Sequence, residues 1–154
     1  MESNEIEFLK QSNWIEAVYD PPSLDDAVRA WKFLKRQESL NIDVIEVVHR
    51  LLMKNKSIPP DELGCYRKSE VMIGDREGLA SHLIFEAMGV WFQNVFNHPE
   101  QWREHHVQFE KIHPFIDGNG RVGRMLMNWE RLKAGLPVLV INEEERQSYY
   151  QWFV

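Results

Sequence analysis

One short segment in the second half of the chain, His113-Pro-Phe-Ile-Asp-Gly-Asn-Gly-Arg121, concentrates residue types that suit chemistry on phosphates. Its glycines let the backbone approach a ligand closely. A helical pattern follows them, so the backbone N–H groups would lie at a helix N-terminus, which favours anions. Arginines three residues apart on that helix are neighbours and suit bidentate contact with phosphate oxygens. The residues predicted to bind phosphate here are Gly118, Asn119, Gly120, Arg121 and Arg124.

Two further side chains complete a set for phosphoryl or nucleotidyl transfer. Asp117 offers a hard carboxylate oxygen for Mg²⁺, which typically binds through one or two carboxylates together with substrate phosphates. His113 is the residue of the segment whose ordinary pKa suits acceptance of a proton near neutral pH. A base, a metal ligand, a phosphate-binding loop and two arginines within twelve residues predict transfer of a phosphorus group.

Other interpretations of the segment are weaker. An EF-hand calcium loop in this register needs an acidic residue at Phe115 and a glutamate at Leu126, and both are apolar. No Gly-Lys-Ser/Thr follows at the spacing of a Walker A loop. Asp-Gly-Asn-Gly is also a common turn string, so an ordinary turn remains the alternative.

The elements that must position this segment are mostly helical. Pro21–Pro22 are expected to end the first helix and Ser23 to begin the second. Asn41 is a candidate N-cap, and Asn142 with Glu145 makes a capping box. Helical patterns are predicted at residues 6–19, 23–34, 42–52, 79–96, 99–112, 119–134 and 143–152. An extended pattern covers residues 65–73, with Gly74-Asp75 as the turn after it. The fold class is therefore all-α with one short extended insert.

Composition limits the possibilities further. The 154 residues suit one domain, and 44% apolar residues, among them six Trp and eight Phe, suit a sizeable core. A formal charge of −6 argues against a general nucleic-acid binder. The only cysteine, Cys65, excludes an internal disulfide and a cysteine-based zinc site. No apolar run is long enough to span a membrane and the N-terminus has no signal-peptide pattern, so we expect a cytoplasmic protein.

The pattern His-Pro-Phe-x-Asp-Gly-Asn-Gly-Arg-x-x-Arg, complete from His113 to Arg124, resembles the signature of the Fic family. Gly64-Cys-Tyr-Arg67 with Val71-Met-Ile-Gly74 resembles the flap of that family, and Lys133-Ala-Gly-Leu-Pro137 with Tyr149-Tyr150 resembles its C-terminal pattern. The resemblance implies a Fic-type helical domain with a short β-hairpin flap near residues 64–74. It also implies a protein adenylyltransferase that moves AMP from MgATP to a Ser, Thr or Tyr hydroxyl of a target protein.

The resemblance assigns roles within the loop. His113 would be the general base, Asp117 would hold Mg²⁺ on the α- and β-phosphates, and Arg121 would bind the phosphates of the leaving pyrophosphate. Phe115 would be a core anchor. Gly120 favours AMP transfer over phosphate transfer, because the phosphotransferase Doc branch has lysine there. The residues that would form the anion hole are Gly118, Asn119 and Gly120.

The resemblance also places residues outside the loop around ATP. Tyr149 would lie near the adenosine. The flap would line the nucleotide and align the backbone of the target protein by strand addition. The flap residues with these roles are Val71, Met72, Ile73 and Gly74.

Ser12-Asn-Trp-Ile-Glu16 resembles the Ser/Thr-x-x-x-Glu motif of an inhibitory N-terminal helix in one class of Fic proteins. The resemblance implies that Glu16, helped by Ser12, pairs with Arg124 and keeps it from the ATP γ-phosphate. Residue 17 is Ala where Gly or Asn is usual, and an ordinary surface glutamate is the alternative. Residues 1–22 would form this inhibitory segment and residues 23–154 the catalytic core of a single domain.

Two other functions stay open. Glu16 could orient a water for removal of AMP from a modified protein, or the chain could be a catalytically silent module that binds ATP or a partner. The expected partner is a target protein along the flap, with no nucleic acid and no membrane. A homodimer through an apolar face of the N-terminal helix is possible.

The remaining histidines receive no chemical role. His105 and His106 suggest a metal pair, but no third ligand accompanies them and zinc sites normally need three or four. We expect His106 to pack behind the loop, and His49 is given no role.

Overall fold

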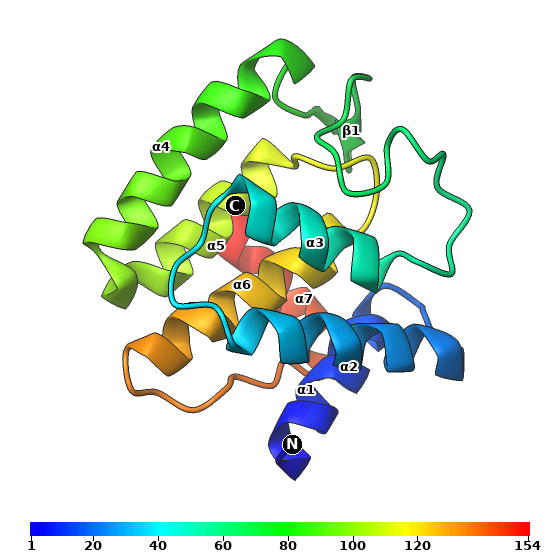
Figure 1. Cartoon of the computed structure of the whole chain (residues 1–154), viewed down its shortest axis with the longest axis vertical. Helices are drawn as coiled ribbons and strands as arrows, with labels where there is room; N and C mark the ends of the chain where they lie inside the picture. The colour runs from blue at the N-terminus through cyan, green and yellow to red at the C-terminus, as the bar shows by residue number, and fades with distance from the viewer.

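The computed structural model describes residues 1–154 and consists of helices around one small hairpin (Figure 1). The all-α class with a short hairpin is confirmed. The α-helices are α1 (Ser3–Ile15), α2 (Pro21–Lys35), α3 (Ile42–Leu52), α4 (Ile84–Asn97), α5 (Trp102–Ile112), α6 (Asn119–Lys133) and α7 (Arg146–Tyr150). The strands are β1 (Met72–Ile73) and β2 (Arg76–Glu77). Short 3₁₀ turns precede α4 (Ser81–Leu83), α5 (Pro99–Gln101) and α7 (Glu143–Glu145), and a fourth follows α7 (Gln151–Phe153).

The boundary between the first two helices differs from the prediction. Helix α1 ends at Ile15, and Ala17 turns the chain with a φ of 57°. Pro21–Pro22 do not end α1 but begin α2, where a missing N–H costs nothing because the first turn has no partner for it. The side chain of Asp20 caps α2 by accepting the Ser23 N–H. The chain therefore leaves α1 six residues before the prolines.

Other predicted helix ends are confirmed. Asn41 caps α3 by accepting the Val44 N–H at 3.0 Å. Asn142 and Glu145 form the predicted capping box, which begins the 3₁₀ turn ahead of α7. These signals were readable because caps are local and depend on residues three positions apart.

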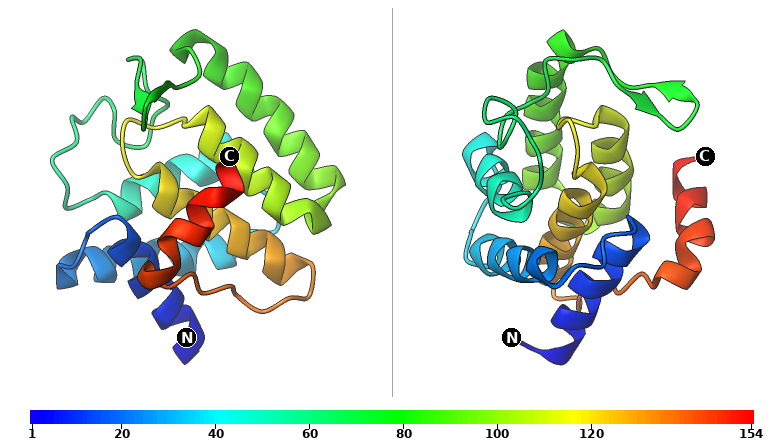
Figure 2. Two further views of the ribbon diagram at one scale, coloured as in Figure 1. Left: turned by 180° about the vertical axis from the view of Figure 1, so that it is seen from behind. Right: turned by 90° about the vertical axis from the view of Figure 1, so that its right-hand side faces the viewer.

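The hairpin lies later than predicted. Residues 65–71 form no strand, and β1 pairs with β2 in antiparallel register, Met72 opposite Glu77. The predicted Gly74 turn joins the two strands with a φ of 63° at the glycine. In the right view of Figure 2 the hairpin projects from the helical body on the side where the C-terminus lies.

Helix α6 is the central element of the core. It is buried along most of its length and contacts α1, α2, α3 and α5. The large buried side chains around it include Phe8, Trp31, Ile45 and Phe109. Burial of one such side chain stabilises the fold by about 1.5–3 kcal/mol, so these contacts hold α6 in place. None of the helices combines the length and the apolar character that a membrane span requires.

Candidate active site

The predicted phosphate loop joins α5 to α6 and is shaped by its own side chains. Helix α5 ends at His113, which adopts a left-handed conformation with a φ of 53°. The buried Asn119 side chain accepts the Phe115 N–H at 2.8 Å and donates to the Phe115 carbonyl at 2.7 Å. Gly118 has a φ of 85° directly before α6, a conformation that other residues adopt at a cost. The first backbone N–H groups of α6 are thereby presented at a helix N-terminus.

His49, which the sequence left without a role, supports this loop from α3. The Gly64 N–H donates to its Nδ1 at 2.8 Å, so Nε2 carries the proton and donates to the Asp117 carbonyl at 2.9 Å. The ring stacks on Phe115 with centroids 4.0 Å apart. Burial lowers the pKa of His49 to about 4 and keeps it neutral. Nothing in the sequence distinguished it from a core histidine on an apolar helix face.

Arg67 ties the loop to the base of the hairpin. Its buried guanidinium donates through Nε to the His113 carbonyl at 2.7 Å and through Nη2 to the carbonyls of Leu79 at 2.6 Å and Ile112 at 3.2 Å. Nη1 donates to the Ser69 carbonyl at 3.0 Å. The sequence placed Arg67 only within the flap resemblance, because its partners are backbone carbonyls that no pattern marks.

His113 faces a cavity of about 380 Å³. Burial, followed by the positive charge of Arg67, lowers the pKa of His113, so its imidazole is neutral at pH 7 and able to accept a proton. Gly120, Arg124 and Glu16 line the same cavity. The geometry thus brings the predicted base to the predicted phosphate-binding turn.

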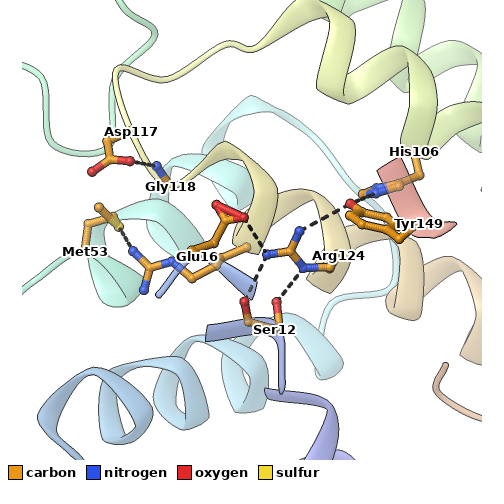
Figure 3. Close-up of polar contacts among 9 residues, drawn as sticks. Ser12, Glu16, Met53, His106, Asp117, Gly118, Arg124 and Tyr149 are labelled. Carbon is orange, nitrogen blue, oxygen red and sulfur yellow. Dashed lines mark hydrogen bonds and ion pairs between the residues drawn. The ribbon is translucent and has the colours of Figure 1, made fainter. Parts of the chain in front are cut away.

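Asp117 presents one carboxylate beside the loop. Its Oδ1 accepts the Gly118 N–H at 2.8 Å (Figure 3). No group of three or more His, Cys, Asp and Glu side chains that could hold a metal exists in the structure. His105 of α5 lies with its Nδ1 2.7 Å from the buried Glu130 carboxyl group. Any metal at Asp117 would need most of its ligands from elsewhere.

The two arginines of the loop differ sharply. Arg121 is buried, its Nη2 meets the Met53 sulfur at 3.0 Å, and its Nη1 has no hydrogen-bond partner. Arg124 is fully engaged: its Nε donates to the Ser12 Oγ at 2.7 Å and its Nη2 to the Ser12 carbonyl at 3.0 Å (Figure 3). The same Nη2 lies 3.4 Å from Glu16 Oε1.

The end of α1 holds the Glu16 carboxylate beside Gly120, in the turn predicted to bind phosphate. A Cβ placed on Gly120 would lie 3.2 Å from Glu16 Oε1. A carboxylate therefore occupies the neighbourhood in which backbone N–H groups at the start of α6 attract anions. Ser12 and Glu16 thus contact Arg124 as their spacing on one helix face allows.

Tyr149 lines the cavity, and His106 supports it from behind. The Arg124 Nη1 donates to the Tyr149 hydroxyl at 3.2 Å, and that hydroxyl lies 2.6 Å from His106 Nε2 (Figure 3). His106 Nδ1 lies 3.1 Å from the Gly123 carbonyl, which assigns the proton to Nδ1 and makes Nε2 the acceptor. His106 thus packs behind the loop, in the way its place in the sequence suggested.

The hairpin and the C-terminal turns supply much of the remaining lining of the cavity. Of the predicted flap residues, Ile73 lines it, whereas Met72 is 59% exposed and, like Val71 and Gly74, does not. The sequence missed several lining residues, because neither the short strand nor the C-terminal turns carry a distinctive pattern. The missed lining residues are Arg76, Glu77, Glu110, Lys111, Tyr150 and Phe153.

An anion-binding loop at the start of a buried central helix, bordered by a hairpin, is the arrangement of a Fic-type domain. Residues 39–130 match the Fic/DOC family. Since this is more than half of the sequence, the chain belongs to that family, as the loop signature predicted.

Curated relatives carry a more specific name. The chain is 32% identical over 143 residues to protein adenylyltransferase Fic of Nematostella vectensis, covering 84% of this chain and 32% of the relative. It is 34% identical over 119 residues to the protein of that name in Aedes aegypti, covering 71% of this chain and 23% of the relative. The chain thus spans about a third or less of the length of these curated relatives.

Solved structures match the fold. A Fic domain containing signaling protein from Bacteroides thetaiotaomicron has a TM-score of 0.82 at 18% identity, covering 96% of this chain and 69% of that one. Residues 134–508 of Fic-1 from C. elegans have a TM-score of 0.82 at 21% identity, covering 98% of this chain and 55% of that one. These similarities confirm the helical Fic fold.

Proposed function

We propose that the chain is a protein adenylyltransferase that transfers AMP from MgATP to a Ser, Thr or Tyr hydroxyl of a target protein. The observation that carries this proposal is the meeting of His113, Gly120 and Arg124 in one cavity at the start of α6. The names of the curated relatives support the same activity.

The chemistry follows from the residues present. His113, neutral at pH 7, takes the proton of the target hydroxyl. The hydroxyl oxygen bonds to the α-phosphorus, the bond from that phosphorus to the bridging oxygen of the β-phosphate breaks, and pyrophosphate leaves. The N–H groups of residues 118–120 and the Arg121 guanidinium stabilise the charge on the phosphates. The buried Arg121 Nη1 suits this role, because it has no partner within the chain.

Asp117 is the residue that would hold Mg²⁺. One carboxylate suits an ion that takes its other ligands from water and substrate phosphates, and no denser ligand cluster is required. The ion, when bound, neutralises charge on the phosphates during transfer.

The N-terminal segment, residues 1–22, is proposed as an inhibitory element on the catalytic core of residues 23–154. Glu16 and Ser12 contact Arg124, and Glu16 lies against Gly120. An arginine held in this way is not available for the γ-phosphate, and the carboxylate repels that phosphate at close range. ATP would then bind in an unproductive position until Glu16 moves away.

The hairpin is proposed to align the target protein. Each of its strands pairs only with the other, which leaves an outer edge where an extended segment could add as a further strand. Ile73 lines the cavity while Met72 is exposed, so the nucleotide would lie against one face of the strand, and the target would add at its free edge.

Incubation of the protein with labelled ATP, Mg²⁺ and cell lysate tests these roles. We expect the Glu16→Gly variant to label proteins more strongly than the wild type, with mass spectrometry showing added AMP. Adding His113→Ala to Glu16→Gly should lower the rate about 10²–10⁴-fold, the usual contribution of a general base. If Glu16→Gly binds ATP but stays silent, transfer or the inhibitory role is wrong. If it binds no ATP with Mg²⁺ present, the chain is a silent module.

A second candidate is removal of AMP from a modified protein. It is favoured by the presence of the Glu16 carboxylate and His113 in one cavity, where the carboxylate could orient a water. An adenylylated protein as substrate separates the two activities. Release of AMP that is lost in Glu16→Gly supports removal, whereas no release by the wild type supports transfer.

A further inference from the structure

Glu110 is a carboxyl group in the cavity that the proposed chemistry leaves unused. It lies on α5 one turn before His113 and lines the same cavity. Its Oε1 is enclosed by protein and has no hydrogen-bond partner, and no ion pair of the structure includes Glu110. An enclosed carboxyl oxygen without a donor makes the charged form costly and favours the protonated acid. The other oxygen, Oε2, is not enclosed and has no protein partner, so it is the oxygen that can meet a ligand in the cavity.

The neighbouring helix makes room for this carboxyl group. A Cβ placed on Gly123 of α6 would lie 2.5 Å from Glu110 Oε1, closer than real atoms approach. Glycine at residue 123 therefore permits glutamate at residue 110. The carboxyl group is wedged against α6 at the level of Arg124 rather than extended into solvent.

The charged and titratable groups around Glu110 come from every element that borders the cavity. Glu16 of α1 and Arg124 of α6 act on it with opposite signs, and the tyrosines of α7 are nearby. The charged or titratable side chains that line the cavity or lie beside Glu110 are Glu16, Arg76, Glu77, His106, Lys111, His113, Arg124, Tyr149 and Tyr150. A charged carboxylate here would repel a polyphosphate that Arg124 attracts.

We propose that Glu110 contacts the nucleotide as a protonated carboxylic acid, donating a hydrogen bond to a phosphate oxygen, so that nucleotide binding takes up one proton from solvent. This inference rests on the proposed function for the identity of the ligand. It assigns Glu110 a binding role and makes the affinity depend on pH.

The electrostatics agree with this geometry. Burial, and then the negative charge of Glu16, raise the pKa of Glu110 to about 7 against the opposing effect of Arg124. A bound phosphate adds negative charge and raises the pKa further. Below about pH 7 the proton is already present and affinity is flat. Above it, affinity falls by up to about tenfold per pH unit. The pKa of His113 is lowered and that of Tyr149 raised, so both stay neutral between about pH 7 and 9.

Titration calorimetry of the full chain with ATP in excess Mg²⁺ tests the inference, in two buffers of different ionisation enthalpy at about pH 6.5 and about pH 8.5. The parent is Glu16→Gly, so that Arg124 is released. Loss of the Glu16 charge lowers the pKa of Glu110, which keeps this carboxyl group ionised at the higher pH before the nucleotide binds. Its matched variants add Glu110→Gln, a neutral isostere that still donates, or Glu110→Ala, which has no donor. Thermal unfolding at both pH values checks that each variant is folded.

At the higher pH we expect the parent to take up about one proton and the Glu110→Gln variant none. Glu110→Gln should then bind at least about thirtyfold tighter than the parent, because this pH lies about 1.5 units above the pKa, and the difference should be much smaller at the lower pH. Glu110→Ala should bind more weakly than Glu110→Gln at both.

Proton uptake that persists in Glu110→Gln overturns the inference, and so do equal affinities of the Gln and Ala variants. Those results leave the proposed function standing. Absence of nucleotide binding at either pH overturns the proposed function and this inference with it.

Discussion

The α5–α6 loop and the hairpin border the same cavity, yet they are built in opposite ways. The loop is fixed by three side chains that bond its backbone groups: His49 and Arg67 come from other parts of the chain, and Asn119 is its own. The hairpin consists of two residue pairs, and its strand residues are exposed except for the half-buried Ile73. The groups proposed for phosphate chemistry are therefore set during folding, while the edge proposed for a target protein has few contacts that hold it.

This difference has an energetic meaning. Groups that stabilise developing charge act best when they need no reorganisation, and a buried, hydrogen-bonded loop meets that requirement. A two-stranded hairpin of this length is marginal by itself. Ordering it against a target would cost free energy at each binding event, which weakens affinity and lets one hairpin accept different backbones.

Arg67 is the link between the two regions, and its loss should have the largest effect. Arg67→Met removes a buried guanidinium that bonds the carbonyls of Ser69, Leu79, Ile112 and His113. With these carbonyls unsatisfied, we expect the free energy of unfolding to fall by about 3–5 kcal/mol, measured by urea denaturation.

Arg67→Lys is the matched control. It keeps the charge but replaces the planar fork of donors by one ammonium group, so it should recover less than half of the loss. Full recovery by lysine would mean that charge, and not the set of hydrogen bonds, joins the loop to the hairpin.

Acid should act on the loop side alone, because the hairpin contains no histidine. Burial, and then the charge of Arg124, lower the pKa of His106 from 6.5 to about 3. Below pH 6.5 the unfolded chain takes up a proton that the folded chain refuses, so stability falls as the pH falls toward the folded pKa. Between about pH 7 and about pH 5 this one residue should cost about 2 kcal/mol.

His106→Gln is the test, by urea denaturation at both pH values. Glutamine keeps a donor for the Gly123 carbonyl and an acceptor for the Tyr149 hydroxyl but does not titrate. The variant should be less stable than the wild type at neutral pH and lose less on acidification. An unchanged pH dependence would show that other groups carry it.

The same contrast explains what the sequence could predict. The loop signature from His113 to Arg124, the helical class and the Asn41 cap depend on residues close together in sequence, and the fold confirms the class and the cap. Long-range partners could not be found in this way. His49 bonds backbone groups 15 and 68 residues away, and Arg67 bonds the His113 carbonyl 46 residues away. No residue type marks a carbonyl that will need a donor.

The start of α2 was mispredicted for a different reason. A proline pair ends one helix as readily as it begins another, and only the left-handed turn at Ala17 decides where α1 stops. The roles of Glu16, Asp117 and Tyr149 in ATP chemistry stay predictions, because geometry shows contacts and not events.

A matched pair of glycine substitutions, one in each region, includes the smallest expected effect, that of Gly74→Ala. Gly118 and Gly74 both have positive φ, 85° and 63°, but a Cβ at Gly118 would lie 2.8 Å from the Met53 sulfur, whereas nothing lies within 4 Å of one at Gly74.

Gly118→Ala should lower the free energy of unfolding by about 2–3 kcal/mol, from backbone strain and the clash. Gly74→Ala meets strain alone, about 1 kcal/mol. The hairpin can relieve that strain by opening locally, so global stability should change by less than about 0.5 kcal/mol. Denaturant midpoints measure both, and hydrogen exchange of the hairpin amides should rise only in Gly74→Ala. Equal losses of stability would contradict the view that the loop is fixed during folding and the hairpin is not.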